Sequence, residues 1–196
     1  EEQEYMITLV TGGCGSGKSE YAENLVAGSG CPCKWYVATM EVWGDEDRRK
    51  VERHRKQRAG KGFHTIERPR GLNALLIPGS PEQTAVLLEC VSNLAANEMF
   101  GGETLPDCAP ELAGAAGEAV VDGITSLARQ AAELVVVTNE VGLDGISYEV
   151  ETMEYIRLMG WVNQRLAKLA DRVVEVVYGI PVVLKENGSA GQGGRI

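Results

Sequence analysis

The stretch MITLVTGGCGSGKS, residues 6–19, decides the fold, because it predicts a strand, a glycine-rich turn and a helix start in immediate succession. Met6 to Thr11 is short, apolar and rich in β-branched residues, which favours a buried strand. Lys18 to about Ala27 is predicted as a helix that ends at Gly28. This order of elements is typical of α/β proteins with parallel sheets.

The rest of the chain continues the alternation of strands and helices. Further strands are predicted at 35–39, 84–88, 134–138 and 173–178 and around His64, and helices at 45–58, after Cys90, at 113–133 and at 150–170. Continuously apolar strands separated by helices indicate a mostly parallel sheet that helices cover on both faces. The 196 residues suit one domain, placed at 6–185, with 1–5 as an extension, 101–110 as a loop and 186–196 as a flexible glycine-rich tail.

The turn itself, Gly12 to Ser19, matches the phosphate-binding pattern G-x-x-x-x-G-K-[ST] in full. Glycines let successive backbone N–H groups point at phosphate oxygens, and the helix N-terminus adds the positive end of its dipole. Lys18 is expected to reach the β- and γ-phosphates, and the Ser19 hydroxyl to ligate Mg²⁺. A turn that only closed a βα connection would not need Lys-Ser at its end. The predicted fold is therefore that of a P-loop NTPase, RecA-like, with nucleotide contacts from Gly12, Gly13, Cys14, Gly15, Ser16, Gly17, Lys18 and Ser19.

The bulk composition excludes several other classes of protein. A formal net charge of −9 argues against binding to a nucleic-acid backbone, which requires an excess of Lys and Arg. The five cysteines form no pair of C-x-x-C motifs and the chain has only two histidines, so neither a disulfide framework nor a histidine-rich metal site is expected. No apolar run is long enough for a membrane-spanning helix, so we expect a soluble, cytoplasmic protein.

A carboxylate, Glu89, closes one of the predicted strands. P-loop proteins usually carry an acidic residue at the end of a second apolar strand, where it helps to hold Mg²⁺, so Glu89 is a candidate metal ligand beside Ser19. A solvated strand end without a metal role is the alternative interpretation. Asn139 and Glu140 end the next long strand and lie on the same carboxyl edge, where open α/β sheets bind ligands. They are candidates for the pocket of a second substrate.

Residues 48–61 carry eight Lys or Arg in an otherwise acidic protein, which concentrates positive potential on one element. A charge run of this kind often forms no more than a solvated helix face. His54 lies in its middle, and a neutral imidazole is a competent nucleophile toward phosphorus. Surrounding cations favour the unprotonated imidazole and would also neutralise a polyphosphate. The residues alone thus permit a covalent role for His54, although a lone histidine on a charged helix is more often a plain surface residue.

A set of motifs follows in order along nearly the whole chain. They are TGGCGSGKS at 11–19, YVAT at 36–39, an arginine–histidine–arginine pattern from Arg49 to Arg58, TIERP at 65–69, LLEC at 87–90, TNEVG at 138–142 and GWVNQRLAKLAD at 160–171. Together they resemble the bifunctional adenosylcobinamide kinase and adenosylcobinamide-phosphate guanylyltransferase family of cobalamin biosynthesis. The chain departs from that family's pattern at Gly15, where the family usually has Arg, at Phe63-His64, and at residues 145–150.

The resemblance implies two successive reactions on a corrinoid substrate. Adenosylcobinamide is phosphorylated on its aminopropanol hydroxyl with ATP or GTP, and a guanylyl group then passes from GTP through a GMP-histidine. His54 matches that histidine, so His54 and Lys18 are the expected catalytic residues. The resemblance also places Thr39, Glu67 and Glu89 beside the nucleotide or its Mg²⁺. It further implies a homotrimer with active sites near the subunit boundaries.

Two other functions stay open from the residues alone. A plain P-loop kinase would transfer only the γ-phosphoryl group and leave His54 incidental. A nucleotide-dependent binding switch would have no small-molecule substrate. The switch is disfavoured because no guanine-reading N-K-x-D motif follows a strand, and TNEV at 138–141 resembles one only superficially.

Overall fold

The computed structural model describes residues 5–41, 44–101, 110–142 and 149–187, except for the side chains of residues 46, 47, 50, 53, 54, 57 and 110–112. The strands are β1 (Met6–Thr11), β2 (Cys33–Ala38), β3 (Phe63–Glu67), β4 (Thr84–Glu89), β5 (Glu133–Val137), β6 (Arg172–Val177) and β7 (Ile180–Glu186). The helices are α1 (Lys18–Ala27), α2 (Asp45–Arg58), α3 (Val91–Phe100), α4 (Pro110–Ala128) and α5 (Val150–Leu169), with short 3₁₀ turns at Leu72–Ala74 and Pro81–Gln83.

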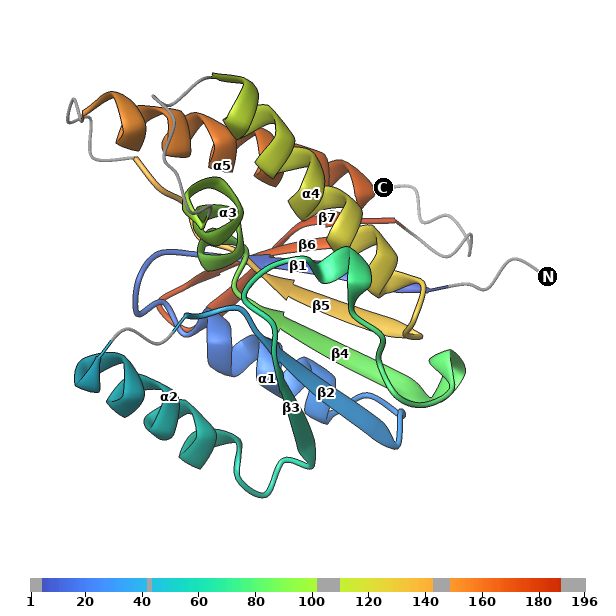
Figure 1. Cartoon of the computed structure of the whole chain (residues 1–196). Coiled ribbons are helices and arrows are strands. Elements are labelled where there is room, and N and C mark those ends of the chain that lie inside the picture. The colour runs from blue at the N-terminus through green and yellow to red at the C-terminus, as the bar shows by residue number, and fades with distance from the viewer. Residues whose placement is uncertain (1–4, 42–43, 102–109, 143–148, 188–196) are drawn as a thin grey trace.

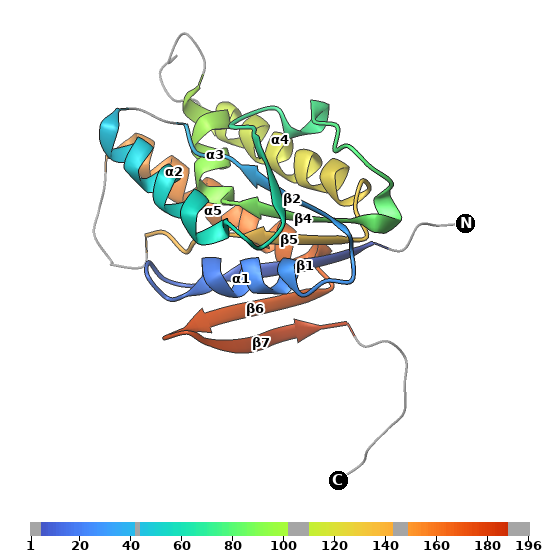
Figure 2. The same cartoon turned by 90° about the horizontal axis from the view of Figure 1, so that it is seen from below.

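The strands form one sheet in the order β3-β2-β4-β5-β1-β6-β7. Every neighbouring pair is parallel except β6 and β7, which form an antiparallel hairpin. Helix α1 packs on one face of the sheet, and α3, α4 and α5 cover the other (Figures 1 and 2). The structure therefore confirms the predicted mostly parallel sheet between two layers of helices.

The central strands are buried on both faces, because their residues alternate between two hydrophobic cores. Leu9 and Val136 belong to the core under α3, α4 and α5, whereas Val10 and Val137 belong to the core under α1. All four side chains are almost completely buried. This two-sided burial explains why the strands are continuously apolar in sequence instead of alternating with polar residues.

The predicted helix at 113–133 is wrong at its C-terminal end, because α4 stops at Ala128 and β5 already begins at Glu133. Gln130 lies in the intervening turn and binds a distant segment of backbone. Its Nε2 donates to the carbonyl of Leu75 at 2.9 Å, and its Oε1 accepts from the backbone N–H of Ile77 at 2.9 Å. These tertiary hydrogen bonds hold the turn, whereas the composition of the segment favoured further helix.

The strand β7 was not predicted from the sequence. It follows β6 through the two-residue turn Tyr178-Gly179, in which both residues have positive φ, 51° and 77°. Such a turn matches the twist of a hairpin, so the dipeptide between two β-branched runs was the available signal. The edge position also explains why β7 tolerates Pro181 and exposes most of its apolar side chains. The predicted tail covers 186–196 and the predicted loop 101–110. Residues 188–196 of the tail and 102–109 of the loop lie outside the described part of the chain.

The connections leave the sheet in opposite directions near its centre. After β1 the chain enters α1 on one face, and after β4 it enters α3 on the other (Figure 1). A crevice opens at the carboxyl ends of the strands where the direction changes, and open α/β sheets bind their ligands there. Within the described part of the chain, no helix combines the length and the apolar character needed to cross a membrane.

Candidate functional site

The loop from Gly12 to Ser19 lies at this crevice, between β1 and α1. Gly12 is required there for a steric reason, since a Cβ on it would lie 2.5 Å from the carbonyl oxygen of Val176 and its φ is 152°. The loop is also fixed to the β6–β7 turn, because the N–H of Gly179 donates to the carbonyl of Ser16 at 2.8 Å. The backbone of the phosphate loop is therefore held in place by the edge hairpin.

Lys18 is buried, and its Nζ donates to the carbonyl of Gly13 at 2.9 Å. An ammonium group has three donors, so this bond leaves capacity for further acceptors. The side chain thus lies folded along its own loop. A phosphate placed against the loop would give this buried cation its anionic partner.

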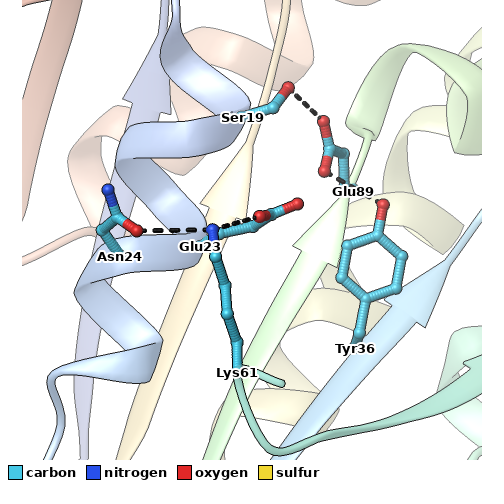
Figure 3. A network of polar contacts seen from close by, with 6 residues as sticks. All are labelled: Ser19, Glu23, Asn24, Tyr36, Lys61 and Glu89. Carbon is cyan, nitrogen blue, oxygen red and sulfur yellow. Dashed lines mark hydrogen bonds and ion pairs between the residues drawn. The ribbon is translucent and has the colours of Figure 1, made fainter. Parts of the chain in front are cut away.

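Ser19, Tyr36 and Glu89 point toward one another from α1, β2 and β4 (Figure 3). The Ser19 hydroxyl donates to one carboxylate oxygen of Glu89, and the Tyr36 hydroxyl donates to the other at 3.0 Å. Burial, followed by the negative charge of Glu89, raises the pKa of Tyr36 far above its ordinary value. The phenol therefore stays protonated and remains a donor to Glu89 at all physiological pH values.

The hydroxyl of Ser19 and the carboxylate of Glu89 fit Mg²⁺. This ion prefers hard oxygen ligands, binds through one or two protein groups, and completes its shell with phosphate oxygens and water. Among the described residues, no cluster of three or more His, Cys, Asp or Glu side chains suited to a metal occurs.

A cavity of about 700 Å³ opens in front of the phosphate loop. Its walls come from the loop, from the carboxyl ends of β2, β4 and β5, from β3 and from α2. The predicted nucleotide residues in its lining are Gly12, Cys14, Gly15, Lys18, Ser19, Glu67 and Glu89. The cavity thus joins loop residues to side chains far away in the sequence.

Thr39, in contrast, does not line the cavity, although its neighbours Ala38 and Met40 do. Its side chain is fully buried, and its hydroxyl donates to the carbonyl of Cys90 at 2.7 Å while accepting from the N–H of Cys90 at 2.8 Å. These two bonds tie the chain after β2 to the chain after β4. Thr39 therefore stabilises the carboxyl edge of the sheet, and its contact with a nucleotide stays a prediction.

Asn139 and Glu140 line the cavity on the side of β5, as their position at the strand end predicted. The Nδ2 of Asn139 donates to Ser92 Oγ at 2.6 Å, and the carbonyl of Ser92 accepts from the Tyr155 hydroxyl at 3.0 Å. Burial raises the pKa of Tyr155 to about 12. This wall is therefore a neutral hydrogen-bonded network, with Glu140 exposed at its rim.

Cys90, which sequence analysis did not single out, also lines the cavity. Burial raises the pKa of its thiol, so the thiolate needed for nucleophilic attack is disfavoured. Its Sγ lies 3.1 Å from Ser92 Oγ. We assign Cys90 a packing role in the wall, since it lacks the properties of a reactive cysteine.

The cationic helix α2 forms a further part of the cavity wall, with Val51, Arg55 and Arg58 in the lining. Arg55 forms an ion pair with Glu67 at 2.8 Å in which both side chains are about half exposed, so it adds little to stability. Arg58 is buried, and its guanidinium carbon lies 3.5 Å from the centre of the Tyr36 ring. The predicted nucleophile His54 belongs to α2, but its side chain is outside the described part of the structure.

Tyr36 and Arg58 were not predicted as site residues. The available signals were the tyrosine that begins YVAT and the arginine that ends the basic pattern, 58 being four residues after His54. Neither signal indicates that the two side chains touch. That contact depends on the parallel pairing of β2 with β3, which brings the chain back beside β2 after α2.

Comparisons with known proteins agree with this geometry. Residues 8–184 match the family described as cobinamide kinase / cobinamide phosphate guanyltransferase. The bifunctional adenosylcobalamin biosynthesis protein CobU of Salmonella typhimurium and that of Escherichia coli are each 38% identical over 188 residues, covering 92% of this chain and 100% of theirs. The corresponding CobP protein of Pseudomonas aeruginosa is 29% identical over 180 residues, covering 92% of this chain and 98% of its own.

Solved structures support the fold alone. One solved ATPase domain superimposes with a TM-score of 0.52 at 9% identity, covering 93% of this chain and 77% of that one. A protein from Pyrococcus horikoshii gives a TM-score of 0.51 at 9% identity, covering 94% and 88%. Because the family match spans nearly all the described strands and helices, and relatives above 30% identity cover the chain almost end to end, this chain belongs to the cobinamide kinase / cobinamide phosphate guanyltransferase family.

Proposed function

We propose that the chain is a nucleotide-dependent transferase that phosphorylates adenosylcobinamide and then transfers a guanylyl group from GTP to adenosylcobinamide phosphate. One observation carries the proposal: a single cavity is lined both by the phosphate loop with its Ser19–Glu89 pair and by the cationic helix α2. A plain P-loop kinase would account for the phosphate loop and the Ser19–Glu89 pair but not for a wall of cationic residues. The second wall supplies cations, and α2 carries His54 in its sequence.

In the kinase step, the substrate hydroxyl attacks the γ-phosphorus and loses its proton to solvent. The bond between this phosphorus and the β,γ-bridging oxygen breaks, and the nucleoside diphosphate leaves. The backbone N–H groups of the loop hold the phosphates, and Lys18 adds a bond to them from the side chain that now contacts Gly13. Mg²⁺, when bound, neutralises charge on the phosphate oxygens. Ser19 and Glu89 would hold that ion, and the amide of Asn139 lines the wall on which we place the acceptor hydroxyl.

In the guanylyl step, a ring nitrogen of His54 attacks the α-phosphorus of GTP and pyrophosphate leaves. A phosphate oxygen of adenosylcobinamide phosphate then attacks the same phosphorus, the P–N bond breaks, and adenosylcobinamide-GDP forms with His54 regenerated. Positions 51, 54, 55 and 58 share one helical face by their spacing, and three of them line the cavity. Arg55 and Arg58 lie on this face, where their charge would stabilise the phosphates of GTP.

Labelling with α-³²P GTP tests the proposal. With Mg²⁺ and no acceptor, we expect a protein-bound label that acid removes and alkali does not, as for a phosphoramidate. His54→Ala should abolish it. His64→Ala is the matched control, because His64 is exposed and packs against Trp35 with ring centres 5.0 Å apart, outside the cavity lining.

Each other outcome has a distinct meaning. A label that survives His54→Ala contradicts the assignment of the nucleophile. Transfer of label from γ-³²P GTP to cobinamide, with no adduct from α-label, identifies a plain kinase. Hydrolysis without transfer to any corrinoid identifies a nucleotide-dependent switch.

We further propose that the enzyme is a homotrimer and that it is located in the cytoplasm. The hairpin of β6 and β7 exposes apolar side chains, with Tyr178 94% and Ile180 64% exposed, and exposed apolar patches mark interaction surfaces. Light scattering that gives the mass of a single chain at micromolar concentration would contradict the trimer.

A further inference from the structure

Arg58 is a buried cation without an anionic partner among the described residues. Arg58 is only 6% exposed, and its Nη1 is shielded from solvent and has no hydrogen-bond partner among the described residues. Arginine cannot lose its charge in a protein, and a buried charge that lacks a counter-charge is unfavourable. Such a group in a binding protein indicates that a ligand supplies the missing anion.

The neighbouring carboxylates are already engaged. Glu67 pairs with Arg55 at 2.8 Å, and Glu89 accepts from Ser19 and Tyr36. On the α1 side, Glu23 is almost completely buried and pairs with Lys61 at 2.8 Å (Figure 3). No ion pair joins Arg58 to any carboxylate among the described residues.

The position of the guanidinium is fixed from one side. It lies over the ring of Tyr36, 3.5 Å from the ring centre, and Phe63 packs edge-on against the same ring at 6.4 Å between centres. An arginine on an aromatic face keeps the edge of its guanidinium free, because stacking uses the face of the group and hydrogen bonds use the edge. The Tyr36 ring thus holds Arg58 without consuming its donors.

Arg58 lies in the walls of two adjoining cavities. One is the 700 Å³ cavity of the phosphate loop, and the other, of about 360 Å³, lies beneath the end of α2. The second cavity is lined by Gly60 and Gly62 of the turn after α2, together with Arg55 and Arg58. A small shift of the guanidinium toward either cavity would bring its edge to a bound group.

We propose that Arg58 binds a phosphate group of a substrate, and that the Tyr36 ring orients it for this role. The planar guanidinium can donate two parallel hydrogen bonds to phosphate, which fits a cavity that Lys18 also lines. The proposal rests on the proposed function for the source of the phosphate, which is either GTP or adenosylcobinamide phosphate. Both are phosphate esters, so the phosphate oxygens of either can accept hydrogen bonds from the same edge of the Arg58 guanidinium.

Isothermal titration distinguishes the two sources. The probes are α,β-methylene GTP with Mg²⁺, which binds without guanylyl transfer, and adenosylcobinamide phosphate with adenosylcobinamide as its unphosphorylated partner. Arg58→Met keeps much of the side-chain length but removes the charge. We expect it to weaken one phosphorylated probe about 10- to 100-fold, the range for hydrogen bonds to a charged group. Binding of unphosphorylated adenosylcobinamide should not change, and Arg58→Lys should recover part of the loss.

Lys56→Met is the matched control, because Lys56 lies on the same helix, its side chain is 76% exposed, and its ammonium group pairs with Glu52 at 3.8 Å. It removes one positive charge and should leave both affinities within about twofold. If Arg58→Met lowers the melting temperature but leaves both phosphorylated probes at wild-type affinity, the role of Arg58 is structural and the proposal is wrong. An equal loss for adenosylcobinamide and its phosphate also overturns it.

The proposed function and this proposal fail in different ways. Absence of corrinoid turnover in the wild-type protein contradicts the function. A selective loss of α,β-methylene GTP binding in Arg58→Met would still support Arg58 as a phosphate ligand, because that measurement needs no acceptor and no chemistry.

Discussion

The Tyr36→Phe substitution isolates one hydrogen bond of the site. The Tyr36 hydroxyl donates to Glu89 at 3.0 Å from a side chain that is only 6% exposed. Phenylalanine keeps the ring that packs against Arg58 and Phe63 and removes only the hydroxyl. Loss of one bond to a charged acceptor should lower the free energy of unfolding by about 1.5 kcal/mol at neutral pH.

The same substitution should change how stability depends on alkaline pH. Burial, and next the charge of Glu89, raise the pKa of Tyr36 far above 10 in the folded protein. A group whose pKa is higher in the folded state contributes stability below its unfolded pKa, and this contribution declines as pH rises above that value. The unfolded chain releases the phenol proton near pH 10 while the folded chain keeps it. By pH 11 the wild-type protein should therefore have lost about 1.4 kcal/mol through this tyrosine.

Urea unfolding of both proteins at pH 9, 10 and 11 measures this effect. The difference in free energy of unfolding between wild type and variant should be constant up to about pH 9.5 and then shrink by about 1.4 kcal/mol at pH 11. Tyr155, whose pKa is raised to about 12, is present in both proteins and cancels in the difference. Parallel curves across this range would show that Tyr36 ionises normally in the folded protein, and the argument for a permanent donor to Glu89 would then be wrong.

Two further predictions concern the phosphate loop and its wall. Gly12→Ala should lower the free energy of unfolding by about 1–3 kcal/mol, because its Cβ would lie 2.5 Å from the Val176 carbonyl. Gly13→Ala, with no protein atom within 4 Å of its Cβ, should leave the free energy of unfolding nearly unchanged, and equal losses of stability would contradict the steric argument. Iodoacetamide at pH 8 should modify exposed Cys14 much faster than Cys90, because burial raises the pKa of the Cys90 thiol. Mass spectrometry of the peptides measures both rates, and Mg-GTP should slow the reaction at Cys14, which lines the cavity. Faster modification of Cys90 would contradict its packing role.

The sequence alone determined the first βα unit and predicted the phosphate-binding chemistry of its turn. Lys18, Ser19 and the glycines are neighbours in the chain, so a local pattern is enough to place them on one loop. The sequence also identified Glu89, because a carboxylate at the end of an apolar strand must lie on the same sheet edge as the loop. It failed for β7, whose exposed edge-strand residues lack the pattern of a buried strand, and at the end of α4, where bonds from Gln130 override an Ala-rich composition.

Only the tertiary structure decided which residues surround the loop. Ser19 and Glu89 are 70 residues apart, and Tyr36 reaches Glu89 because β2 pairs directly with β4. Arg58 lies on the Tyr36 ring because β3 returns beside β2 after the cationic helix. Strand order and the path of a crossover are set by packing of the whole chain, which no local pattern encodes. The phosphate loop could therefore be predicted residue by residue, whereas the buried charge of Arg58, which has no anionic partner in the described part of the chain, became visible only once the sheet was assembled.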